Sequence, residues 1–365
     1  MSDRPVLVKC LVWDLDNTVW DGTLLEDGEV DLRAGVLATV EELDRRGILQ
    51  SVSSRNDHDP TWRRLTELGL ADYFVAPRIG WGRKSDAVRA IAERLDFALT
   101  TIAFIDDQPA ERAEVRYHLP EVRCYTAEQV AELVSLAEFS PTTVTVDARR
   151  RRSMYQANLR REAAQADFTG PDHDFLRSLE LVMRIGRATG EELSRVSELT
   201  LRTSQMNATG VHYPDATLRG LLDDAGHEVL VTTLADRFGS HGAVGVLLLR
   251  RHPGVWHLKL LATSCRVVSY GAGTAILSWL ADQAARAGVH LLADFRPTDR
   301  NRMMDIAYRF AGFGDGGCAC RDELPPATEP DVRRLHLVPA AQPESTTIRL
   351  TAPDLTTRPA SSVPG

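Results

Sequence analysis

The chain has 365 residues, enough for two domains, and its 43% hydrophobic and 26% charged residues are typical of a soluble globular protein. A net charge of −8 argues against nucleic-acid binding, and no apolar run reaches the length of about 18–20 residues that a membrane span needs. With five cysteines and no apolar segment ahead of the first strand, we expect a cytoplasmic protein without disulfides, signal peptide or membrane contact.

The first part of the chain alternates short apolar runs with amphipathic segments. Strands are expected at 6–13, 48–55, 73–76, 101–107 and 122–126, and helices at 34–46, 60–70, 84–96 and 110–119. This alternation predicts an α/β domain over residues 1–137, with a parallel sheet that has helices on both faces.

A linker with a basic helix is expected next, over residues 138–178. The run Arg149–Arg152 opens that helix. It is either a solvated helix start or a docking surface for an acidic partner.

A second α/β domain is expected over residues 179–323. Its strands are expected at 179–185, 227–236, 242–251, 255–264 and 289–295, and its helices at 191–202, 274–288 and 300–311. Residues 324–365 are rich in proline and lack a periodic apolar pattern, so we expect a disordered tail.

Polar side chains gather at strand ends and at one helix start of the first domain. They are Asp14 and Asp16, Ser53 to Asn56, Lys84, and Asp106 and Asp107. Because parallel strands end at the same edge of a sheet, we expect these groups to converge there. A strand alternates faces, so Asp14 and Asp16 leave it on one side, and two close carboxylates favour a cation between them.

Such a set suits phosphoryl transfer with Mg²⁺, which prefers carboxylate oxygens. One carboxylate can attack phosphorus to form an aspartyl-phosphate, while the other passes a proton to the leaving group. A hydroxyl and an ammonium can stabilise the phosphate oxygens. Only three of the 43 basic residues are lysines, and Lys84 is one of them. A lysine in place of arginine at this position is expected if the site needs a compact positive charge.

The stretch Asp14-Leu-Asp16-Asn17-Thr18 resembles the DxDxT/V signature of the haloacid dehalogenase (HAD) superfamily. The resemblance implies that Asp14 is the nucleophile and Asp16 the general acid/base, and the second aspartate favours a phosphatase over a dehalogenase. Further roles follow from it. Phosphate would be bound by Ser54 (or Ser53), Arg55, Asn56 and Lys84, and Mg²⁺ by Asp14, Asp16 and Asp106 or Asp107.

The intervals from Asp16 to Ser53 and from Ser54 to Lys84 are filled by the expected helices and strands. This leaves no room for a cap domain. Either the site is open and accepts a large or protein-borne substrate, or a loop or the second domain covers it.

The stretch "LLATSCRVVSYGAGTAILSWL" resembles the acyl-CoA-binding turn of the GNAT acetyltransferases, with Arg266 and Gly271 at motif positions and Ser269 in place of the first glycine. Cys265 directly precedes this turn. The adjacent arginine and the following helix start would favour its thiolate, and the alternative is an inert, packed cysteine.

The other cysteines are expected to be inert. Cys10 and Cys124 fall in strand cores. Cys318 and Cys320 form a CxC pair without a visible second pair of ligands, so no metal site is expected there.

Several blocks together resemble the FkbH-like family over residues 6–313, among them "VWDLDNTVWDGTLLEDG", "SVSSRND", "IGWGRKSDAVRAIAERL", "TIAFIDDQPAERAEVR" and "TSCRVV". The resemblance implies an uncapped HAD phosphatase domain joined to a GNAT-like domain. It also implies conversion of 1,3-bisphosphoglycerate into a glyceryl thioester on an acyl carrier protein, for methoxymalonyl extender units or tetronate rings in polyketide biosynthesis.

The same resemblance implies that Cys265 carries the glyceryl group before its transfer to the phosphopantetheine thiol of the carrier. His241, with Asp236 near it, is a candidate base for the thiol, although the resemblance does not require histidine there. Two alternatives remain: a HAD small-molecule phosphatase fused to a CoA-dependent N-acetyltransferase, and a non-catalytic scaffold, against which the complete set of site residues speaks.

Overall fold

The computed structural model describes residues 5–142, 144, 146–203, 205–325, 331–342 and 345–357. The chain divides into two compact units, Met1–Ala163 and Ala164–Gly365, and the division falls inside helix α7 (Arg151–Ala166). None of the helices in the described part of the chain is long and apolar enough to cross a bilayer.

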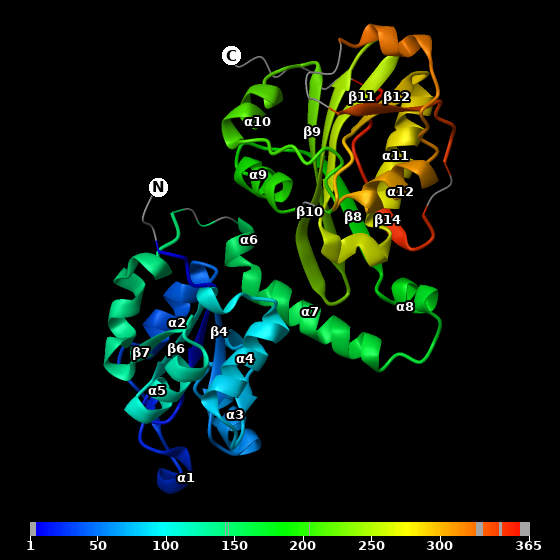
Figure 1. Ribbon diagram of the computed structural model, residues 1–365. Helices are drawn as coiled ribbons and strands as arrows, with labels where there is room; N and C mark the ends of the chain where they lie inside the picture. Colours follow the sequence, from blue (N-terminus) through cyan, green and yellow to red (C-terminus); the bar gives the residue numbers. More distant parts are fainter. Residues whose placement is uncertain are drawn as a thin grey trace, which may run out of the picture. The chain divides into compact units, whose positions relative to one another are not determined.

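Five parallel strands form the main sheet of the first unit, in the order β5-β4-β1-β6-β7 (Figure 1). They are β1 (Cys10–Trp13), β4 (Leu49–Ser54), β5 (Arg78–Ile79), β6 (Ile102–Asp106) and β7 (Arg123–Thr126). The expected parallel α/β sheet is confirmed, and β1 lies at its centre between β4 and β6.

Helices cover both faces of this sheet. Leu11 and Trp13 of β1 point into one core and Cys10 and Val12 into the other, because a strand alternates faces. The first core is shared with α2 (Val36–Arg45) and α3 (His58–Glu67), and the second with α4 (Lys84–Leu95) and α5 (Pro109–His118). The unit also contains the 3₁₀ helices η1 (Ala71–Tyr73), η2 (Leu99–Thr101), η3 (Ala127–Ser135) and η4 (Ala137–Phe139).

A small hairpin occupies the stretch between Asp16 and α2. It consists of β2 (Trp20–Asp21) and β3 (Asp31–Leu32), with the one-turn helix α1 (Leu24–Asp27) between them. The whole insertion is thus far smaller than a cap domain.

The basic run Arg149–Arg152 begins in α6 (Val146–Arg149) and enters α7. Arg151 donates a hydrogen bond to the Gly47 carbonyl at 2.7 Å, and Arg152 forms an ion pair with Asp44 at 2.9 Å. These two arginines therefore hold α7 against the end of α2 within the first unit, whereas Arg149 and Arg150 are exposed, and a docking surface at this run stays a prediction.

The second unit is built on a seven-stranded mixed sheet, in the order β13-β12-β11-β10-β9-β8-β14. Its strands are β8 (Leu181–Arg187), β9 (His227–Asp236), β10 (Gly239–Arg251), β11 (Val255–Thr263), β12 (His290–Phe295), β13 (Arg333–Leu337) and β14 (Ile348–Thr351). The pairs β11–β12 and β14–β8 are parallel, and the other neighbours are antiparallel.

Two cores lie against this sheet. The larger contains α11 (Ala272–Ala287), α12 (Arg302–Phe310) and α8 (Asp172–Ser178), and the smaller contains α9 (Leu193–Arg202) and α10 (Asp215–Leu222). Two 3₁₀ helices, η5 (Cys265–Tyr270) and η6 (Ala319–Glu323), connect elements of this unit.

The expectation that residues 324–365 form a disordered tail is wrong for part of this segment. β13 pairs with β12, and β14 pairs with β8, so the tail supplies both outer strands of the sheet. Each strand is too short for a periodic pattern, yet Leu335 and Ile348 are buried in the larger core. Leu355 is buried as well, and its N–H donates to Gln283 Oε1 of α11 at 2.8 Å.

Candidate active site

Two aspartates of the first unit lie at the ends of neighbouring central strands. Asp14 follows β1, and its N–H donates to the Ile105 carbonyl of β6 at 2.9 Å; Asp106 ends β6. Asp14 is 6% exposed and Asp106 is fully buried. The parallel sheet therefore brings these two carboxylates to one edge, as expected from their positions in the chain.

Lys84, the first residue of α4, places its ammonium among these carboxylates. It hydrogen-bonds the Asp14 carboxylate and, at 2.7 Å, the Ser53 carbonyl. Its Nζ lies 3.3 Å from Asp106 Oδ2 and 3.2 Å from Glu111 Oε2. A lysine only 2% exposed needs such partners, because an unpaired buried charge is strongly unfavourable.

Glu111 is a member of this cluster that our sequence reasoning missed. It lies in the first turn of α5, is mostly buried, and pairs with Arg55 Nη1 at 2.8 Å as well as with Lys84. Because Glu111 belongs to a helix, a search of strand ends does not find it. The available signal was its position four residues after Asp107, in the first turn of the helix that follows β6.

The electrostatics of the cluster follow from its burial. Burial raises the pKa of Asp14 to about 6, and Lys84 offsets only part of that effect. Burial and the neighbouring Asp14 raise the pKa of Asp106 to about 7. Burial alone would lower the pKa of Lys84, but the surrounding carboxylates outweigh it and raise that pKa, so the lysine stays charged.

Asp16 has a different environment from Asp14. Its Oδ1 accepts hydrogen bonds from Trp20 Nε1 at 2.8 Å and from the Leu24 N–H at 3.1 Å, and its Oδ2 accepts one from Asn56 Nδ2 at 3.1 Å. The two aspartates thus have separate partners. These three donors fix the orientation of the partly exposed Asp16 carboxylate, as a proton-transferring group requires.

The residues expected to bind phosphate lie at the end of β4 beside a surface cleft of about 460 Å³. Ser54, Arg55 and Lys84 line this cleft together with residues of the 77–87 segment, including the exposed Trp81. Asn56 is buried and donates to Asp16, so in this structure it orients the second aspartate. Ser53 is buried, and its carbonyl accepts from Lys84.

Three carboxylates of the cluster offer oxygens for a hard divalent cation, and one oxygen of each also faces the Lys84 ammonium. Carboxylate oxygens of Asp14, Asp106 and Glu111 lie within 4.8 Å of one another. Asp106 Oδ2 and Asp107 Oδ1 are buried and have no hydrogen-bond partner among the described residues, although the former lies near Lys84. This set suits Mg²⁺. It differs from the expected ligands in including Glu111, while the Asp16 carboxylate is already engaged by three donors.

In the second unit, Cys265 is exposed and begins η5, two residues after β11 ends. Arg266 Nε donates to Ser264 Oγ at 3.4 Å, which places this guanidinium at the same turn. Gly271 has a φ of +76°, a left-handed conformation that favours glycine, and it caps the start of α11. A strand–turn–helix is therefore present, with Cys265 exposed at its start, and the binding of acyl-CoA at this turn stays a prediction.

Asp236 and His241 form a pair in the β9–β10 hairpin. His241 Nε2 lies 3.1 Å from Asp236 Oδ2, and the His241 ring packs edge-on against Tyr270, the last residue of η5. Within the described residues, no hydrogen bond joins His241 to Cys265. The structure thus links the hairpin to η5 through Tyr270, and the role of His241 as a base for the thiol stays a prediction.

No family model matches the chain, and no curated protein matches it. Solved structures do. The chain is similar to the N-terminal part of a Bacteroides fragilis protein, which contains a phosphatase domain and was solved with Mg, at 30% identity. That match covers 33% of this chain and 36% of the other, with a TM-score of 0.30, so the chain spans about a third of that relative.

Two further matches are an aminoglycoside acetyltransferase in complex with coenzyme A and a deoxy-D-mannose-octulosonate 8-phosphate phosphatase from Haemophilus influenzae. Both have 16% identity; they cover 42% and 36% of this chain and 94% and 89% of the other chains, with TM-scores of 0.32 and 0.29.

Proposed function

We propose that the first unit is a Mg²⁺-dependent phosphatase that works through an aspartyl-phosphate. The observation that carries this proposal is the buried Asp14 carboxylate at a strand end, held by Lys84 beside an open cleft. Asp16 supplies a second carboxylate, fixed by its own donors and more exposed than the first. Two carboxylates in different environments suit a nucleophile and a separate acid/base.

In the proposed reaction, an Asp14 oxygen bonds to phosphorus as the ester P–O bond breaks, and Asp16 gives its proton to the departing oxygen. Asp16 then takes a proton from the water that hydrolyses the aspartyl-phosphate. Lys84 and Ser54, which line the cleft, stabilise the phosphoryl oxygens. Asp14, Asp106 and Glu111 would hold the Mg²⁺, whose charge offsets those of the carboxylates and the phosphate.

For the whole chain, we propose glyceryl transfer from 1,3-bisphosphoglycerate to an acyl carrier protein. The exposed Cys265 thiolate would attack the acyl-phosphate carbon, forming a thioester while the C–O bond breaks and inorganic phosphate leaves. The phosphopantetheine thiol of the carrier would then take the acyl group and return the Cys265 thiolate. The remaining phosphate ester would be hydrolysed in the first unit.

Intact-protein mass spectrometry of a holo carrier protein tests this proposal, with 1,3-bisphosphoglycerate, Mg²⁺ and the enzyme present. We expect a glyceryl adduct with the wild type and no adduct with Cys265→Ala. Asp14→Asn should leave a phosphoglyceryl adduct, since only phosphate removal depends on that carboxylate. Cys124→Ala, which removes a half-buried thiol of the first unit, is the matched control and should load the carrier normally.

Failure of the wild type to load any carrier would overturn the glyceryl-transfer proposal while leaving the phosphatase testable on simple phosphate esters. Acetyl transfer from acetyl-CoA to an amine, unaffected by Cys265→Ala, would instead favour the phosphatase–acetyltransferase fusion. Full phosphatase activity in Asp14→Asn would overturn the role of the nucleophile.

A further inference from the structure

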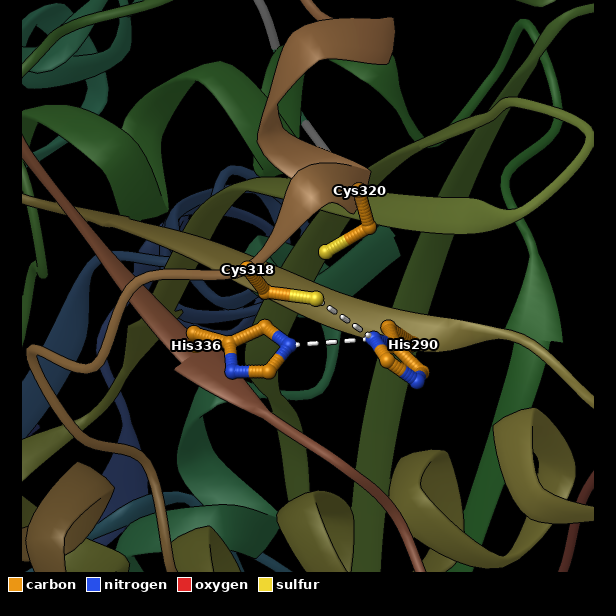
Figure 2. Close-up of side chains that lie close together, drawn as sticks. All are labelled: His290, Cys318, Cys320 and His336. Carbon is orange, nitrogen blue, oxygen red and sulfur yellow. Dashed lines mark hydrogen bonds between the residues drawn. The ribbon is translucent and has the colours of Figure 1, made fainter.

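Four potential metal ligands meet in the second unit, and none of them has a role in the function proposed above. They are His290 at the start of β12, His336 in β13, and Cys318 and Cys320 at the start of η6 (Figure 2). Cys318 Sγ lies 3.3 Å and His336 Nε2 lies 3.1 Å from His290 Nδ1. One ligand atom from each of the four residues lies within 4.8 Å of all the others.

The fold brings these ligands together by strand register. His336 is paired with Leu292, and His290 lies two residues before Leu292, so both imidazoles leave the sheet on the same face. Cys320 packs over that face against the small core of Leu292 and Leu324. The sequence alone did not show this convergence, because the histidines come from two strands far apart in the chain.

Backbone hydrogen bonds hold the loop before the cysteines in place. Gly314 and His336 exchange two such bonds, of 2.8 and 2.7 Å, which tie the 314–318 segment to β13. Arg321 of η6 donates to the Arg334 carbonyl of β13 at 2.9 Å. The four ligands are thus carried by a loop, a 3₁₀ helix and two paired strands that are already joined to one another.

We propose that His290, Cys318, Cys320 and His336 bind one Zn²⁺ ion. Two thiolates and two imidazoles are a preferred tetrahedral zinc set, whose ligand atoms should be about 3.3–3.8 Å apart, given Zn–S and Zn–N distances of about 2.3 and 2.0–2.1 Å. The two separations from His290 Nδ1, 3.1 and 3.3 Å, are close to these values, and the other ligand atoms lie within 4.8 Å of one another. With four protein ligands no position remains for substrate, so the site is structural and fastens η6 and β13 to β12.

Metal analysis of the full-length protein, purified without chelator under reducing conditions, tests the proposal. We expect inductively coupled plasma mass spectrometry to find about one zinc ion per chain. We also expect the Co²⁺-substituted protein to show the visible bands of a tetrahedral site and thiolate-to-cobalt charge transfer. Cys318→Ser and His336→Gln should lose the zinc. Cys124→Ser and His173→Gln, which change the same residue types elsewhere, should keep it.

A second measurement needs no variant and so does not depend on folding of the mutants. Iodoacetamide labelling followed by peptide mapping should show Cys318 and Cys320 protected with zinc and modified after chelation. The exposed Cys265 should react in both states and serves as the internal control. Absence of zinc together with no tetrahedral cobalt spectrum, or equal labelling of the pair with and without zinc, would overturn the proposal.

Discussion

The two ligand clusters of this chain are opposites in chemistry and in surroundings. In the first unit, three carboxylates surround a lysine next to an open cleft. In the second, two thiols and two imidazoles meet over the face of a sheet, with no described lysine or carboxylate in their set. Oxygen ligands favour Mg²⁺, whereas sulfur and nitrogen favour Zn²⁺. Under the two proposals, the chain would use an exchangeable Mg²⁺ for chemistry and a fixed Zn²⁺ for architecture.

Selective metal removal is the strongest test of this contrast, and we expect it to change activity more than any other experiment proposed here. Mild chelation should abolish phosphatase activity, and added Mg²⁺ should restore it while the zinc content stays unchanged. Cys320→Ser should show the reverse, with zinc lost and phosphatase activity within about twofold of wild type at a temperature where the protein is folded. Loss of phosphatase activity in Cys320→Ser without unfolding would mean that the two centres are not independent.

Glu111→Gln gives an intermediate effect, because it removes one charge from the proposed Mg²⁺ set and one partner of Lys84. We expect phosphatase activity to fall about 10- to 100-fold, with a higher Mg²⁺ concentration needed for half-maximal rate. Glu114→Gln is the control: it lies on the same helix but accepts hydrogen bonds from Ser85. If both variants had equal Mg²⁺ requirements, Glu111 would be a purely structural residue.

The smallest expected effect concerns an ion pair outside both centres. Hydrogen bonds from Arg45 and then Arg46 lower the pKa of Glu42 from 4.5 to about 2. A lowered folded-state pKa stabilises the protein above the unfolded pKa, and this contribution is lost as the pH falls from about 4.5 to about 2. Glu42→Gln should thus cost about 1 kcal/mol or less of unfolding free energy at neutral pH.

Calorimetry of the first unit's transition in the full chain, at neutral pH and near pH 2–3, measures this difference. The difference in unfolding free energy between wild type and Glu42→Gln should disappear as the pH falls towards 2. A gap that stayed constant with pH would show that the glutamine disturbs packing against the 134–140 segment, which Arg46 also contacts.

The carboxylate–lysine cluster of the first unit was largely predictable from the sequence, since Asp14, Asp106 and Lys84 stand where strands end or a helix begins. Those positions are set by chain order in a parallel sheet. Glu111 was not predicted because it lies inside the first turn of its helix, neither at a strand end nor at the first residue of a helix. The Cys–His cluster and the outer strands escaped for another reason. Their residues come together through strand pairing in a mixed sheet, which the order of elements in the chain does not determine. In addition, a strand as short as β13 has too few residues to show an alternating apolar pattern.

The outer strands β13 and β14 also have a consequence for self-association. Without them, β12 and β8 would each present a row of unpaired N–H and C=O groups, to which a strand of another copy could add. The tail fills both positions with strands of only five and four residues, each bearing arginine. Short edge strands with charged side chains are poor templates for strand pairing between molecules. The two strands of the tail therefore cover edges of β12 and β8 that could otherwise pair with another copy of the chain.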